Sequence, residues 1–258
     1  MELLGLGSSY LSLSTFTHMH LLDHILIFCL LVLLPARSLW AGRQAGGGLP
    51  ASFTHEAKMV LYYGNSALLW MLAAAVGLVC WFYGRPAREI GLQWGETPYG
   101  GMAQALVLLF LVLYILDVFA EVGKLSKKEV ERAKAIPTLP AFLPSTGREF
   151  IHYSFLALSA GLAEEIVYRG YCISYLQAII GDEDWWQLAL ILLLPAVAFG
   201  MGHIYQGWQA VVKIVIMATL FGAIFWLRSS LWVLMLLHVA VDLVGGLLGW
   251  NILRDKPV

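Results

Sequence analysis

Residues 101–121 read GMAQALVLLFLVLYILDVFAE, an apolar run in which the first charged side chain is Asp117. A helix needs about 20 such residues to cross the hydrocarbon core of a bilayer, which is roughly 30 Å thick. The run lacks the alternation of apolar and polar residues that marks a membrane β-strand. A helix also satisfies every backbone polar group internally, as lipid requires. The stretch therefore predicts a membrane-spanning helix.

Six further apolar segments approach this length. Hydrophobic residues make up 60% of the 258 residues and charged residues only 13%, against about a quarter in soluble proteins. The composition excludes a soluble enzyme and predicts an all-α, polytopic transmembrane helix bundle that forms one integral membrane domain over residues 1–258. The expected spans are residues 19–35, 59–83, 101–121, 150–180, 186–204, 208–227 and 230–251.

Lys and Arg in the loops predict the orientation, because cytoplasmic loops are enriched in them. Residues 36–58, residues 122–149 and the C-terminal tail together carry eleven, while the loops of the other side carry three. With seven helices, the N-terminus is expected outside and the C-terminus in the cytoplasm, in a bacterial inner membrane. The first twenty residues contain no Lys or Arg, so we expect no cleaved signal peptide.

Residues 122–149 form the longest polar segment. Ser126 and Glu129 have the spacing of a capping box, which predicts a short basic, amphipathic helix on the cytoplasmic surface. A second pair, Thr146 and Glu149, has the same spacing and is expected to begin the next helix.

That next helix carries charges inside an apolar run. Residues 161–170 read GLAEEIVYRG, and the helix is long enough that it must tilt, kink near Gly161 or begin along the interface. Glu165 and Arg169 are four residues apart, so an ion pair is expected. Glu164 lies about 140° from Arg169 around a helix, which leaves it unpaired and suited to act as a general base. The alternative is that all three charges form one packing network.

Two later helices add polar side chains. His203 ends the fifth helix, and His238 and Asp242 share one face of the seventh. Because the fourth helix rises from the cytoplasm and the fifth and seventh descend to it, these residues and Glu164 are expected to meet in the inner half of the bilayer. The alternatives are an interfacial His203 and a local pair of His238 with Asp242.

A glutamate, two histidines and an aspartate suit three chemical schemes. They can activate a water for attack on a peptide carbonyl and stabilise the oxyanion, bind Zn²⁺, or form a proton or cation path. No H-E-x-x-H motif occurs, so a zinc site would depend on residues distant in sequence. Few polar residues follow Arg169 in its helix, which disfavours a transport path, and the absence of G-x-S-x-G disfavours a serine hydrolase.

Three short motifs occur in order on successive helices. EEIVYR at 164–169 fits E-E-x-x-x-R, FGMGH at 199–203 fits F-x-x-x-H, and HVAVD at 238–242 fits H-x-x-x-N/D. The chain thereby resembles the CPBP family of glutamic-type intramembrane proteases, the CAAX-protease and bacteriocin-processing group also called Abi. The resemblance predicts a catalytic core over residues 147–251, with the helices of residues 1–122 outside it.

The resemblance implies an intramembrane endopeptidase that cleaves a membrane-anchored protein or peptide. Its partners would be this substrate and the lipid bilayer, not a nucleic acid, and it would need no cofactor, with zinc as the alternative. The catalytic residues it implies are Glu164, His203, His238 and Asp242, supported by Glu165, Arg169 and Phe199.

The last motif departs from the eukaryotic prenyl-protein proteases of the family, which have asparagine where this chain has Asp242. A carboxylate accepts hydrogen bonds but donates none, so Asp242 would orient His238 rather than contribute a donor to the oxyanion hole. A prenylated CAAX substrate therefore does not follow from the resemblance. Bacterial relatives that act as immunity proteins or membrane scaffolds provide a non-catalytic alternative.

Overall fold

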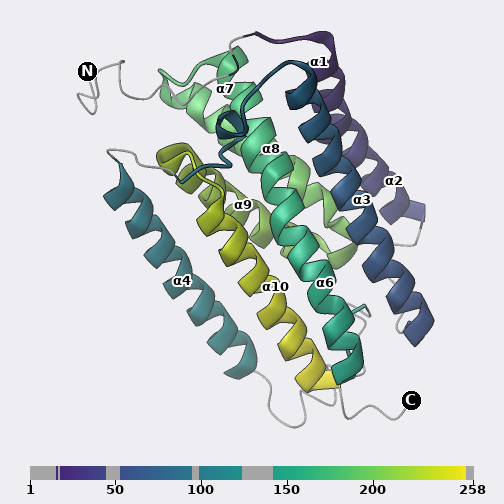
Figure 1. Ribbon diagram of the computed structural model, residues 1–258. Coiled ribbons are helices and arrows are strands. Elements are labelled where there is room, and N and C mark those ends of the chain that lie inside the picture. Colours follow the sequence, from purple (N-terminus) through teal and green to yellow (C-terminus); the bar gives the residue numbers. More distant parts are fainter. Residues whose placement is uncertain (1–15, 17, 45–52, 95–98, 124–141, 254–258) are drawn as a thin grey trace.

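The structure is a computed structural model (Figure 1) that describes residues 16, 18–44, 53–94, 99–123 and 142–253. Within these residues it consists of helices and connecting turns, without a strand. Seven of the described helical segments are long and apolar enough to cross a membrane: Leu21–Arg43, His55–Phe82, Gly100–Ala120, Gly147–Ile180, Trp185–Gly202, Trp208–Arg228 and Trp232–Asn251. The prediction of an all-α bundle with about seven spans is confirmed.

The spans consist of the following elements. The first contains α1 (Leu21–Phe28), η1 (Cys29–Leu33) and α2 (Leu34–Gln44), and the next two are α3 (His55–Phe82) and α4 (Gly100–Gly123), with η2 (Ala87–Ile90) between them. The fourth contains α6 (Gly147–Glu164), η3 (Glu165–Ile173) and α7 (Ser174–Ile180). The remaining elements are α8 (Trp185–Gly202), η4 (Ile204–Gln206), α9 (Trp208–Arg228) and α10 (Trp232–Leu253).

Two predicted boundaries, the end of the first span and the start of the second, differ most from the structure. The first span continues to Arg43 instead of ending at residue 35. Pro35, which has no N–H to donate, lies in the first turn of α2, directly after the π-helical turn η1. Lys58 belongs to α3 and is buried, although the sequence placed it in a loop. The predicted amphipathic helix at Ser126 lies outside the described residues.

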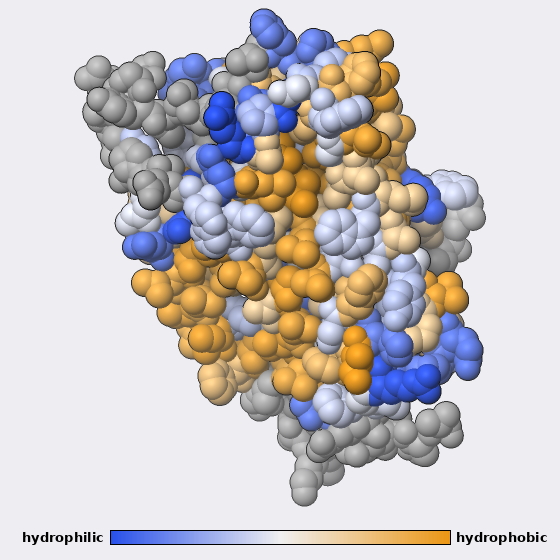
Figure 2. Space-filling view, in the orientation of Figure 1, coloured by the Kyte–Doolittle hydropathy of each residue, from blue (hydrophilic) through white to orange (hydrophobic). Residues whose placement is uncertain are grey.

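The bundle is arranged around α6. This helix packs against both α3 and α10, while α8 packs against α9. In Figure 1, α4 stands at one edge of the bundle and α1 to α3 stand at the other. Apolar side chains cover much of the middle of the face seen in Figure 2, and hydrophilic residues gather toward its two ends. This distribution is expected of a bundle whose middle lies in lipid.

The long fourth span does not kink at Gly161 but changes its helix type. The chain is α-helical to Glu164, π-helical from Glu165 to Ile173, and α-helical again from Ser174. Gly161 has a different role: a Cβ atom there would lie 2.4 Å from Val239 Cγ2 and 2.8 Å from Val239 N on α10. The missing side chain therefore allows the backbones of α6 and α10 to approach closely, just before the two glutamates.

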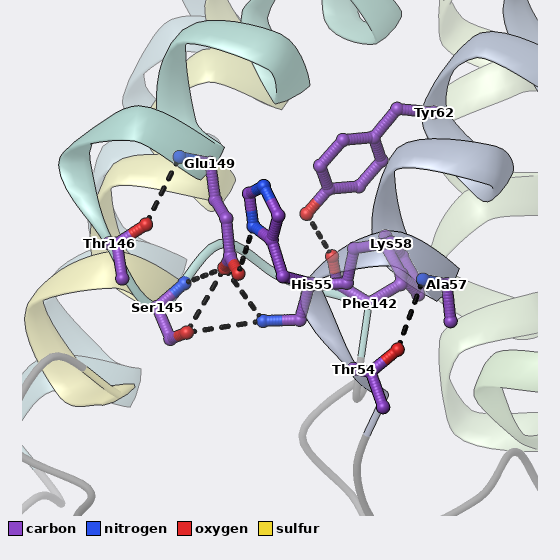
Figure 3. Close-up of polar contacts among 9 residues, drawn as sticks. All are labelled: Thr54, His55, Ala57, Lys58, Tyr62, Phe142, Ser145, Thr146 and Glu149. Atoms are coloured by element: carbon purple, nitrogen blue, oxygen red, sulfur yellow. Dashed lines mark hydrogen bonds and ion pairs between the residues drawn. The ribbon is translucent and has the colours of Figure 1, made fainter. Parts of the chain in front are cut away.

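A buried ion pair ties α3 to the start of α6 (Figure 3). Lys58 Nζ donates to Glu149 Oε2 at 2.8 Å, and the same oxygen accepts from Ser145 N at 2.8 Å. His55 Nδ1 lies 3.1 Å from Glu149 Oε1. Thr146 Oγ1 accepts from Glu149 N at 3.1 Å, which confirms the predicted N-cap of α6. The Glu149 carboxylate accepts hydrogen bonds from Lys58 and Ser145, and not from the Thr146 N–H that would complete a capping box.

A second buried ion cluster joins α1 to the π-helix at the other end of the bundle. Asp23 is fully buried and accepts two hydrogen bonds from Arg85, at 2.6 and 2.7 Å. The Tyr171 hydroxyl, which belongs to η3, donates to Asp23 Oδ1 at 2.7 Å. The N-terminal helices thus contact both ends of the helix that carries the two glutamates, and hold it in place between them.

Candidate active site

Glu165 and Arg169 form the predicted ion pair in the π-helix. Arg169 Nη1 donates to Glu165 Oε1 at 2.9 Å, and both side chains are buried. The Arg169 guanidinium also lies over two aromatic rings, 4.8 Å from the centroid of Phe199 and 5.5 Å from that of Phe221. The π-helical turn is a feature often found at functional sites, and here it presents this pair to α10.

His238 of α10 joins the ion pair from the opposite side. Its Nδ1 donates to Glu165 Oε1 at 2.7 Å. Glu165 Oε1 therefore accepts from both Arg169 and His238, while Glu165 Oε2 is buried without a hydrogen-bond partner among the described residues. The orientation of the His238 ring is fixed by this contact, which leaves Nε2 facing the other carboxylates of the site.

Glu164 approaches the second nitrogen of the same ring. Glu164 Oε2 lies 3.5 Å from His238 Nε2, and the Glu164 side chain is 12% exposed. Among the described residues the Glu164 carboxylate accepts no hydrogen bond. The two glutamates, which the sequence predicts to face different surfaces, therefore meet one imidazole ring at its two nitrogens.

Asp242 lies one helical turn after His238. Its Oδ2 is 3.8 Å from His238 Nε2, which is an ion-pair contact and too long for a hydrogen bond. The Asp242 side chain is 29% exposed, so exposure increases from Glu165 through Glu164 to Asp242. The polar cluster is closed at the ion pair and accessible on the Asp242 side.

His203 is placed by the end of α8. Its Nδ1 lies 2.9 Å from the Phe199 carbonyl oxygen. Because a carbonyl only accepts, Nδ1 carries the proton, and Nε2 of the neutral ring is an acceptor. Burial lowers the pKa of His203, which favours this neutral form. The Phe199 ring lies 4.7 Å from the His203 ring and 6.2 Å from the His238 ring, centroid to centroid.

The structure thus brings Glu164, Glu165, Arg169, His238 and Asp242 into direct contact, and connects His203 to them through Phe199. Among the described residues, no three His, Cys, Asp or Glu side chains are arranged to hold a metal ion.

Sequence reasoning missed several neighbours of the site. The Phe221 ring packs 6.3 Å from the His238 ring, and the hydroxyls of Tyr114 and Tyr153 donate to the carbonyl oxygens of Val241 and Asp242, at 3.2 and 3.3 Å. These aromatic residues come from α9, α4 and α6, and no local motif marks them. Tyr205 also contacts His203 and lies two residues after it, just past the end of the second motif.

One comparison with known proteins matches the part of the chain that carries this cluster. Residues 146–244 match the model of the family described as Type II CAAX prenyl endopeptidase Rce1-like. The match begins at the N-cap of α6 and ends just after Asp242, so it contains the whole cluster, whereas α1 to α4 lie outside it. Searches of curated proteins and of solved structures found no match. Residues 146–244 are thus similar to the Rce1-like CAAX endopeptidases of the CPBP (Abi) family, the family that the three sequence motifs resemble.

Proposed function

We propose that this protein is an intramembrane endopeptidase in which Glu164, assisted by His203, activates a water molecule for attack on a peptide bond. The observation that carries the proposal is the difference between two adjacent glutamates. Glu165 is buried and bound by Arg169 and His238, whereas Glu164 is partly exposed and its carboxylate accepts no hydrogen bond among the described residues. A carboxylate that is free to accept a proton is what a general base requires.

The reaction follows from these positions. Glu164 accepts a proton from the water, and the resulting hydroxide forms a bond to the carbonyl carbon of the scissile peptide. His203 Nε2 accepts a hydrogen bond from the same water and orients it. The proton on Glu164 then moves to the amide nitrogen as the C–N bond breaks, which releases an amine and a carboxylic acid. The glutamate returns to its starting form.

His238 stabilises the negative oxygen of the tetrahedral intermediate. With Nδ1 directed to Glu165 at 2.7 Å, a proton on Nε2 can be donated to the oxyanion, and a ring that donates from both nitrogens is an imidazolium. The carboxylates of Glu164 and Asp242, 3.5 and 3.8 Å from Nε2, balance that charge. Preorganised donors of this kind lower a barrier by several kcal/mol.

The substrate in this proposal is a membrane-anchored protein or peptide, reached from the Asp242 side, where the cluster is exposed. The proposal extends to the expected orientation, with the N-terminus outside and the C-terminus in the cytoplasm of a bacterial inner membrane. It involves no metal and no other cofactor.

The test is cleavage by protein reconstituted in lipid vesicles with a library of membrane-anchored peptides, analysed by mass spectrometry in H₂¹⁸O. The proposal predicts new peptide termini with ¹⁸O in the released carboxyl group, and loss of cleavage in Glu164→Gln. It also predicts that the wild type still cleaves in the presence of chelators and that the purified protein contains less than one metal ion per chain. Cleavage by Glu164→Gln at the wild-type rate would contradict it. Inactivation by chelators would favour zinc chemistry, and a wild type that cleaves no peptide would favour a scaffold or immunity role.

A further inference from the structure

The proposed site has fewer hydrogen-bond donors than its chemistry calls for. Among the described residues, His238 Nε2 is the one donor assigned above to the oxyanion, because Asp242, as a carboxylate, only accepts. Oxyanion sites of peptide-cleaving enzymes combine several donors, and removal of one typically costs about 10²- to 10³-fold in kcat. A further donor that substrate can reach is therefore expected beside the cluster.

Tyr205 is in a position to be this donor. It lies in η4, two residues after His203, and its ring centroid is 6.0 Å from that of His203. Its ring is also 5.9 Å from the ring of Phe142, which packs against the cluster of Tyr62, Tyr153 and Ala157. The Tyr153 hydroxyl donates to the Asp242 carbonyl oxygen. Tyr205 therefore lies beside His203, and Phe142 connects it to the aromatic cluster that contacts α10 at Asp242.

Tyr205 is partly exposed, and its hydroxyl group is held in place. Gln206 Nε2 donates to the Tyr205 hydroxyl oxygen at 3.0 Å. This contact occupies the acceptor side of the oxygen and leaves its proton to be donated elsewhere. The residue is 38% exposed, so an extended peptide at the Asp242 side of the cluster can reach it.

Electrostatics keep this group a donor. The pKa of Tyr205 is raised to about 12. Burial among the surrounding side chains is the largest cause, and the negative charges of Glu164 and Asp242 act in the same direction, while the hydrogen bond from Gln206 lowers the pKa. At neutral pH the phenol therefore carries its proton.

We propose that the Tyr205 hydroxyl donates a hydrogen bond to the oxyanion of the tetrahedral intermediate and so supplies the donor that Asp242 cannot. This inference rests on the proposed function. The proton stays on the phenol oxygen throughout, and no bond to Tyr205 forms or breaks.

The experiment compares Tyr205→Phe with the wild type on a peptide that the wild type cleaves in vesicles. The expected result is a fall in kcat of about 10²-fold with little change in KM, because the contact forms only in the transition state. The control is Tyr63→Phe, which removes a hydroxyl that bonds to His152 on the α3–α6 face and should leave kcat unchanged. Wild-type kcat in Tyr205→Phe, or an effect confined to KM, would overturn the inference.

A second variant separates a donor role from a structural one. In Tyr205→Phe/Asp242→Asn the new asparagine amide can donate where the carboxylate could not, so kcat should recover at least tenfold relative to Tyr205→Phe. No recovery would show that the two positions do not share a role, and would overturn the inference. If the wild type cleaves and Glu164→Gln does not, failure of these Tyr205 results leaves the proposed function standing. A wild type without any cleavage refutes both.

Discussion

Replacing Arg169 by methionine should destabilise the folded protein by about 3–5 kcal/mol, the range for breaking one partner out of a buried ion pair. Arg169 is 3% exposed and Glu165 is fully buried, so the glutamate that remains cannot recover its lost contact from water. The variant also loses two cation–π contacts, over Phe199 and Phe221, each contributing about 0.5–2 kcal/mol. Methionine keeps much of the packing volume, so the loss reports on charge.

The assay is unfolding in mixed micelles with increasing SDS, followed by the fluorescence of the 10 tryptophans. A double-mutant cycle adds Glu165→Gln and Arg169→Met/Glu165→Gln. Residues in direct contact couple by about 0.5–3 kcal/mol, so the double variant should be more stable than the sum of the single losses predicts. Glu164→Gln is the matched control, and it should change stability by less than about 1 kcal/mol, because its carboxylate accepts no hydrogen bond.

Two outcomes would refute this reasoning. The first is an Arg169→Met variant that unfolds within about 1 kcal/mol of the wild type, which would mean that the ion pair is solvated. The second is strict additivity of Glu165→Gln and Arg169→Met, which would mean that the two residues stabilise the fold independently.

Three further predictions concern the packing of α6 and the protonation of His203. Gly161→Ala should lower the free energy of unfolding by about 1–3 kcal/mol through overpacking against α10. In the same micelle assay Gly245→Ala should be neutral, because its Cβ would meet no atom within 4 Å. Equal stability of the two variants would contradict the close approach of α6 and α10. Lys58→Met should lower the free energy of unfolding by about 3–5 kcal/mol, because it leaves a buried carboxylate without its cation. His55→Ala should lower it less, because the His55 ring is more exposed than Lys58. The reverse order would contradict the arrangement in Figure 3. Because burial lowers the pKa of His203, its ring should stay neutral at pH 6.5, where an ordinary histidine is half protonated. ¹⁵N NMR of labelled histidine in bilayers should show a protonated Nδ1 and an unprotonated Nε2 for His203. An imidazolium signal from His203 would contradict this prediction.

The sequence predicted what depends on local spacing. Apolar run lengths predict the spans because a bilayer sets a minimum length for a helix. The spacing of four residues between Glu165 and Arg169 predicts their ion pair, since that spacing brings two side chains together on a helix.

Contacts between distant segments could not be predicted in this way. Glu165 and His238 are far apart in the chain, and their hydrogen bond depends on the close approach that Gly161 allows between α6 and α10. The π-helix was also missed, because a wheel with 100° per residue assumes α-helical bonding throughout, whereas a π-helix has i→i+5 bonds. This is why Glu164 and Glu165 seemed to face different surfaces, although both contact His238, at 3.5 and 2.7 Å.

Buried charges near helix ends show the same limit. Lys58 borders an apolar run and carries a positive charge, so the sequence places it in a cytoplasmic loop. In the structure it is buried and donates a hydrogen bond to Glu149, which balances its charge. Asp23, fully buried with Arg85, had no sequence signal because its two partners, Arg85 and Tyr171, are far from it in the chain.

The most direct test of the account compares Glu164→Gln and Glu165→Gln in one experiment that measures both peptide cleavage in vesicles and unfolding in micelles. The account predicts that Glu164→Gln loses cleavage and keeps its stability, because Glu164 acts on water and holds no partner by a hydrogen bond. It predicts that Glu165→Gln loses stability, because Glu165 binds both Arg169 and His238. A Glu164→Gln variant that cleaves like the wild type, or that unfolds as readily as Glu165→Gln, would contradict the division between one working glutamate and one structural glutamate.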